Sequence, residues 1–198
     1  MNRRDAIKKS ALLFGGSLLM PDILKAWTHP AIENLYWRLT AAQDALIAEI
    51  AETIVPTTDT PGAKAAGVPA FIKKMLADCY REKYSSYFMK ELDSVEADTK
   101  AKFGKSFVDA TGDQRTEILK MYEQKAKTEA AKFREEAQSW GQSTLPGERP
   151  FFAVMKDLTV TGYFTSEIGC TQALRYEPVP GKYIGDYPYK KGDKAWAT

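Results

Sequence analysis

Histidine and cysteine are scarce in this chain of 198 residues, which has one histidine and two cysteines. So small a stock of soft ligands argues against a structural zinc site or an iron–sulfur cluster held by this chain alone. The sequence also lacks a Gly-x-Gly-x-x-Gly fingerprint, a phosphate-binding loop and the Cys-x-x-Cys-His signature of covalent haem. We therefore expect no catalytic, cofactor-binding or metal site in this chain.

A strong excess of one charge and a long apolar run are missing too. The formal net charge of +2 gives no basic field of the kind that attracts nucleic acid. No apolar run is long enough to span a bilayer as part of a mature chain. The composition, with 44% hydrophobic and 27% charged residues, is that of an ordinary globular protein. The length of the chain suggests one domain.

The groups that could carry chemistry are isolated from one another in the sequence. His29 has no neighbour that would orient it as a base, so a surface or capping role is favoured. The spacing of Asp157 and Glu167 does not predict an acid–base pair, and ion pairing or capping explains them better. Cys79 and Cys170 would meet oxidising conditions in an exported protein and could pair with each other. Cys79 reads as a helix core residue, which makes Cys170 the better candidate for a disulfide to a partner chain.

Residues 1–26 read as a twin-arginine export signal. A basic head containing Arg3 and Arg4 precedes a short, glycine-containing apolar core at residues 11–20. The alternative is a basic amphipathic N-terminus. No clear cleavage site follows, so we expect cleavage to be inefficient, absent or placed near Ala26. An uncleaved segment would leave the protein tethered by its N-terminus. This pattern predicts a periplasmic protein.

Apolar residues recur at helical spacing through most of the chain and predict an all-α fold. Thr40 with Gln43, and Thr111 with Gln114, match the capping boxes that begin helices. Gly104 is placed to end a helix in a left-handed cap. We expect a compact bundle of about five helices. They cover residues 40–55, 69–84, 87–103, 113–139 and 150–168, with a linker at 140–147.

Two stretches rich in proline and glycine fall outside these helices. Residues 56–69 contain three prolines and two glycines, which predicts a structured loop between two helices. Residues 171–198 combine prolines and glycines with tyrosines and a tryptophan, and they predict an extended, irregular C-terminal arm. The arm either lies along a partner or covers the helices of its own chain.

Two blocks of sequence carry a resemblance to a known family. The first is Ile54-Val55-Pro56, then Thr-Asp-Thr-Pro-Gly-Ala at 58–63 and Ala-Gly-Val at 66–68, and the second spans residues 156–181. They resemble the gluconate 2-dehydrogenase subunit 3 family. The resemblance implies an all-α, non-catalytic small subunit of a large GMC-type dehydrogenase that oxidises a sugar, sugar acid or polyol. The large subunit would hold FAD and every catalytic residue, and electrons would pass to a haem c or iron–sulfur carrier elsewhere in the complex, often a cytochrome c subunit.

These observations give one interpretation of the chain and two alternatives. A signal at 1–26, a helical domain at 27–170 and an arm at 171–198 would form a subunit that binds, stabilises and co-exports the flavoprotein. The side chains expected at the interface are Tyr163, Phe164, Arg175, Tyr176 and Tyr183. The alternatives are a stand-alone periplasmic helical enzyme or ligand-binding protein, and a scaffold tethered by its N-terminus.

Overall fold

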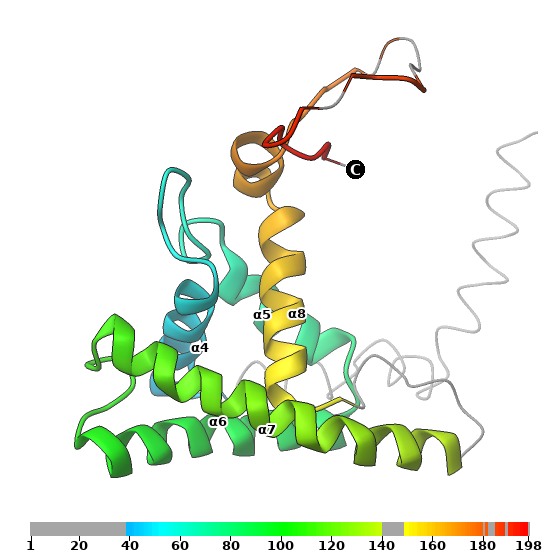
Figure 1. Cartoon of the computed structure of the whole chain (residues 1–198). Helices are drawn as coiled ribbons and strands as arrows, with labels where there is room; N and C mark the ends of the chain where they lie inside the picture. The colour runs from blue at the N-terminus through cyan, green and yellow to red at the C-terminus, as the bar shows by residue number, and fades with distance from the viewer. Residues whose placement is uncertain (1–38, 140–148, 180, 182–184, 189, 198) are drawn as a thin grey trace, which may run out of the picture. The chain divides into compact units, whose positions relative to one another are not determined.

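The computed structural model describes residues 39–139, 149–179, 181, 185–188 and 190–197, without the side chains of 131–139. Within these residues the fold is helical, as predicted, and no strand is present beyond one isolated bridge (Figure 1). The elements are α4 (Ala41–Ile54), α5 (Val68–Asp78), α6 (Glu82–Phe103), α7 (Gly112–Ser139), α8 (Phe151–Phe164) and a short π-helix, η1 (Gly169–Ala173). The predicted export signal and the linker at 140–147 lie outside the described residues.

The predicted helix ends are confirmed where a capping motif sets them. At the start of α4, the Thr40 amide donates to the Gln43 side chain (3.0 Å) and the Gln43 amide donates to the Thr40 hydroxyl (3.2 Å). Thr111 and Gln114 repeat this pair of bonds at the start of α7, over 3.0 and 3.4 Å. Gly104 ends α6 with φ of 67°, a left-handed conformation that suits glycine.

The helix predicted over residues 69–84 is wrong, because the chain breaks there into α5 and α6. Helix α5 ends at Asp78 with Cys79 as its C-cap, and α6 begins at Glu82. The buried Ser85 hydroxyl donates to the Leu76 carbonyl (2.8 Å), so a side chain of α6 satisfies a carbonyl at the end of α5. Cys79 is exposed, which corrects its expected place in the core.

The last long helix is also shorter than predicted. Helix α8 ends at Phe164 rather than near Ile168, and Gly169 begins η1 instead of terminating a helix. A Cβ atom at Gly169 would lie 1.8 Å from the Tyr163 carbonyl oxygen. Glycine is therefore required at this position by a close approach of the backbone to itself.

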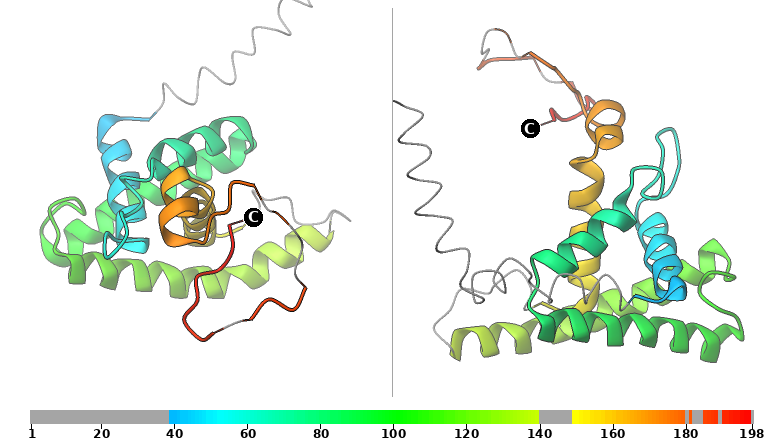
Figure 2. Two further views of the ribbon diagram at one scale, coloured as in Figure 1. Left: turned by 90° about the horizontal axis from the view of Figure 1, so that it is seen from above. Right: turned by 180° about the vertical axis from the view of Figure 1, so that it is seen from behind.

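Helix α8 packs against α4, α5, α6 and α7 and forms the centre of the core. Helices α6 and α7 run side by side, and α8 crosses this pair, with α4 and α5 beside it (Figures 1 and 2). Phe71 of α5 lies where a Cβ atom at Gly162 would fall, at 2.6 Å, so the missing side chain lets α5 and α8 approach closely. The buried face of α8 comprises Phe151, Phe152, Val154, Met155, Leu158, Thr159, Gly162 and Tyr163.

Candidate partner-binding surface

The carboxylate of Glu52, near the end of α4, organises the loop that follows this helix. Its Oε1 atom accepts hydrogen bonds from the Thr57 amide (3.0 Å) and the Thr57 hydroxyl (2.8 Å). Its Oε2 atom accepts from the Lys64 amide (2.9 Å). The Thr57 hydroxyl in turn accepts from the Gly62 amide (3.0 Å), so one carboxylate fixes both sides of the loop.

Burial and hydrogen bonding act in opposite directions on the pKa of Glu52. Partial burial raises the pKa, but the amides of Lys64 and Thr57 and the Thr57 hydroxyl stabilise the carboxylate and leave the pKa below its ordinary value. Gly62 is buried beside this group, where a Cβ atom would lie 2.2 Å from Glu52 Oε1. The charged form of Glu52 is thus part of the folded loop.

Two further contacts fix the loop to the helices around it. The Tyr163 hydroxyl of α8 donates to the Pro61 carbonyl (2.9 Å) and lies 3.1 Å from the Thr60 hydroxyl. Glu49 of α4 pairs with Lys64 (2.5 Å) and with Arg115 of α7 (2.6 Å). Residues 56–59 of the loop remain exposed on this fixed support.

Exposed apolar side chains lie next to this anchored loop. Tyr163 is only 3% exposed, whereas the adjacent Phe164 is 40% exposed and Val160, one turn earlier, is 37% exposed. The rings of Tyr163 and Phe164 meet edge to face, with centroids 5.3 Å apart. At the end of α8, Tyr163 therefore holds the loop, while Phe164 and Val160 expose apolar surface.

Because η1 and its C-cap occupy residues 169–174, the irregular C-terminal arm comprises residues 175–198 rather than 171–198. It continues this apolar exposure and is folded back on itself. The Arg175 amide donates to the Ala195 carbonyl (2.8 Å), the Ala197 amide donates to the Arg175 carbonyl (2.9 Å), and Arg175 and Trp196 form a parallel bridge. Figure 2 shows the arm leaving η1 and returning toward it. Its exposed apolar side chains are Tyr176, Val179, Tyr187 and Trp196.

Residues 41–181 match the sequence profile of the family described as gluconate 2-dehydrogenase subunit 3. The chain belongs to this family. Membership makes it a subunit of a dehydrogenase complex. Comparison with curated proteins gave no match, and comparison with solved structures gave none either. The matched region contains the anchored loop, all of α8 and the first part of the arm.

The five residues predicted to lie at the interface differ in their exposure to solvent. Phe164, Arg175 and Tyr176 are exposed, and their contact with a partner stays a prediction. Tyr163 is buried and bonded to the loop, so the structure gives it an internal role and we do not carry it forward as a contact residue. Tyr183 lies outside the described residues.

The groups that could carry chemistry have separate places in the part of the chain that the structure describes. Asp157 pairs with Arg149 (2.7 Å), as the ion-pairing interpretation predicted. Cys79 and Cys170 are both free, and the Cys170 thiol donates to the Phe164 carbonyl (3.0 Å), which leaves a bond between chains as a prediction. His29 lies outside the described residues. Among the residues that the structure describes, no cluster of His, Cys, Asp and Glu could hold a metal ion.

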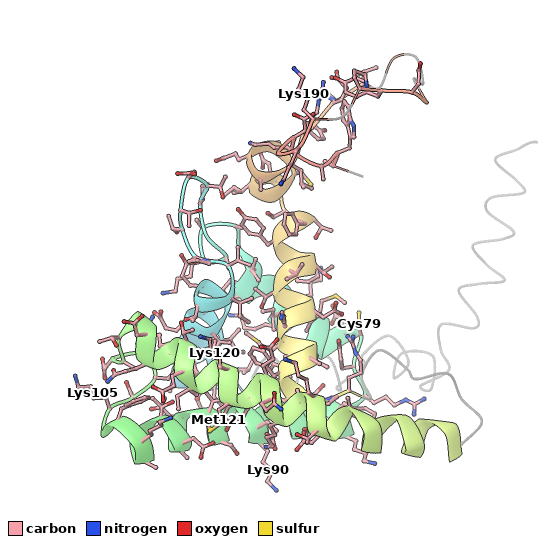
Figure 3. The ribbon with its side chains drawn as sticks, in the orientation of Figure 1. Cys79, Lys90, Lys105, Lys120, Met121 and Lys190 are labelled. Carbon is pink, nitrogen blue, oxygen red and sulfur yellow. The ribbon has the colours of Figure 1, made fainter. Side chains whose placement is uncertain are left out.

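A shallow groove lies between α4, α7 and α8. Ile54, Leu119 and Phe152 supply its apolar lining. The charges of Lys156 and Glu123 at its side pair with each other (3.0 Å), and Lys120, labelled in Figure 3, also lines it. No described helix is both long and apolar enough to cross a membrane.

Proposed function

We propose that this chain is the non-catalytic small subunit of a periplasmic dehydrogenase complex. It binds and stabilises a large FAD-dependent, GMC-type subunit that oxidises a sugar, sugar acid or polyol. The large subunit holds FAD and the catalytic residues, and a separate haem c or iron–sulfur carrier takes the electrons. Family membership over residues 41–181 is the observation that carries this proposal.

The geometry at one end of the helical domain supports a binding role. The loop is fixed by Glu52 and Tyr163, so its exposed tip is held on a rigid base. Phe164, Tyr176 and Trp196 add exposed aromatic surface, and such residues are enriched at interfaces. Preorganised aromatic surface reduces the entropy lost on binding and is suited to a permanent partner.

Export of both chains by one signal forms the second part of the proposal. A flavoprotein that folds around FAD before export needs a route that moves folded cargo, and Arg3 and Arg4 give the small subunit a twin-arginine signal. Changing both residues to lysine is expected to retain both subunits in the cytoplasm. Fractionation of cells that express the two chains measures this. Normal export of both chains by the double variant would contradict the shared-signal proposal.

A further inference from the structure

Arg175 is held in place by its backbone on both sides. It follows Leu174, the C-cap of η1, and its amide and carbonyl groups bond Ala195 and Ala197 across the closed arm. The Lys194 amine also donates to the Gln172 carbonyl, which ties the returning segment of the arm to η1. The Cα atom of Arg175 therefore has little freedom relative to η1.

The guanidinium group of Arg175 is held by two aromatic rings. It lies 4.1 Å from the centroid of the Trp196 ring and 4.9 Å from that of the Tyr187 ring. The two rings meet edge to face, with centroids 5.6 Å apart. Contact with aromatic faces attracts a guanidinium group electrostatically and restricts its position.

No carboxylate pairs with Arg175 in the part of the chain that the structure describes. Arg115 and Arg149 differ in this respect, since Arg115 bonds Glu49 (2.6 Å) and Arg149 bonds Asp157 (2.7 Å). On the arm itself, Asp193 instead accepts a hydrogen bond from the Lys190 amide (2.8 Å). Arg175 thus combines a restricted position with exposed donors that have no carboxylate partner among the described residues.

We infer that the stacked Arg175 receives a carboxylate side chain of the dehydrogenase subunit in a bidentate pair. This inference rests on the proposed function and adds the chemistry of the contact. A planar fork matches a carboxylate in a way that a lysine amine does not. The two rings against the guanidinium, Tyr187 at 42% exposed and Trp196 at 45%, flank the charge with apolar area that a protein surface would cover.

The described part of the arm carries one more cationic than anionic side chain. Its described cationic side chains are Arg175, Lys190, Lys191 and Lys194, against the anionic Glu177, Asp186 and Asp193. Lys190 projects away from the rest of the arm (Figure 3). Because it carries the same charge without stacked rings, it provides a matched control for the role of Arg175.

The test uses the full chain expressed with its flavoprotein and compares Arg175→Ala, Arg175→Lys and Lys190→Ala. We expect Arg175→Ala to weaken the complex roughly tenfold to a hundredfold, as loss of a charge-assisted pair does. Arg175→Lys should recover only part of this, and Lys190→Ala should change affinity by less than about twofold. The dissociation constant of the complex measures the loss of affinity. Its dependence on salt concentration shows whether the loss is electrostatic, because salt screens charge pairs. Circular dichroism checks that each variant is folded, and Trp196→Phe, which keeps a ring for stacking, should bind better than Trp196→Ala.

The outcomes separate the inference from the proposed function. If the unaltered chain does not bind the flavoprotein, the proposed function fails. If it binds and both Arg175 variants match it, or Lys190→Ala weakens binding as much as Arg175→Ala, the carboxylate contact is refuted while the subunit role stands. Binding of free gluconate to the isolated chain that disappears in Arg175→Ala would assign the site to a small acid and overturn the inference.

Discussion

The hydroxyl group of Tyr163 joins α8 to a loop that lies 102 residues earlier in the chain. Replacing Tyr163 by phenylalanine keeps the ring and leaves the Pro61 carbonyl and the Thr60 hydroxyl without this partner. We expect the free energy of unfolding to fall by about 1 kcal/mol, the usual net value of such a bond. Urea denaturation measures it.

The matched control is Tyr176→Phe, because Tyr176 is 52% exposed. Its substitution should leave the free energy of unfolding nearly unchanged. Equal losses in the two variants would show that the Tyr163 hydroxyl does not hold the loop.

At the scale of an element, the loop after α4 should depend on pH through Glu52. The pKa of Glu52 in the folded chain lies below its ordinary value of 4.5, because its three donors outweigh the effect of burial. A depressed folded pKa stabilises the fold above the unfolded pKa, and the stabilisation is lost as pH falls through the folded pKa. The unaltered chain should therefore lose stability on acidification below about pH 4.5.

Glu52→Gln provides the comparison for this pH dependence. An amide has one acceptor oxygen, and its NH₂ group would face a donor, so the variant should be less stable near neutral pH. The stability difference between the two proteins should shrink as the pH falls. Urea midpoints measured across the acid range test this, and parallel curves would contradict the role given to the Glu52 charge.

The C-terminal arm makes its described backbone bonds to itself, and Lys194 bonds η1. Removing residues 175–198 leaves α4 to α8 and η1 in the chain, so the helical circular dichroism should be largely retained. Binding of the flavoprotein should be lost because the exposed aromatic side chains and Arg175 go with the arm. Binding at full yield would exclude the arm from the interface. Unfolding of the truncated chain would instead show that the arm belongs to its own core.

Viewed over the whole molecule, the sequence was informative where local chemistry decides the structure. The capping boxes at Thr40 and Thr111 predicted helix starts because the bonding atoms are three residues apart. The break after Asp78 was missed because apolar spacing continues across it, and the Ser85 hydroxyl that stabilises it acts nine residues away. The early end of α8 was missed because the interruption is short: the chain turns at Thr165 and Ser166 and is helical again before η1.

The candidate surface was predictable in its composition but not in its assembly. The aromatic arm and Phe164 stand out in the sequence, and the resemblance to the family pointed to the loop. The burial of Tyr163 depends on a loop a hundred residues earlier, and the Arg175–Trp196 contact depends on how the arm closes. No periodic pattern predicts either, since both arise from contacts between distant segments.

The central claim is that this subunit binds a flavoprotein and leaves catalysis to it. The most direct measurement is purification through a tag on this chain from cells that express both subunits, followed by separation of the chains and a flavin spectrum of each. We predict one large subunit per small subunit, with all flavin and all sugar, sugar-acid or polyol oxidation in fractions that contain the large subunit. Recovery of this chain alone, or flavin in stoichiometric amount on this chain after separation, would contradict the account.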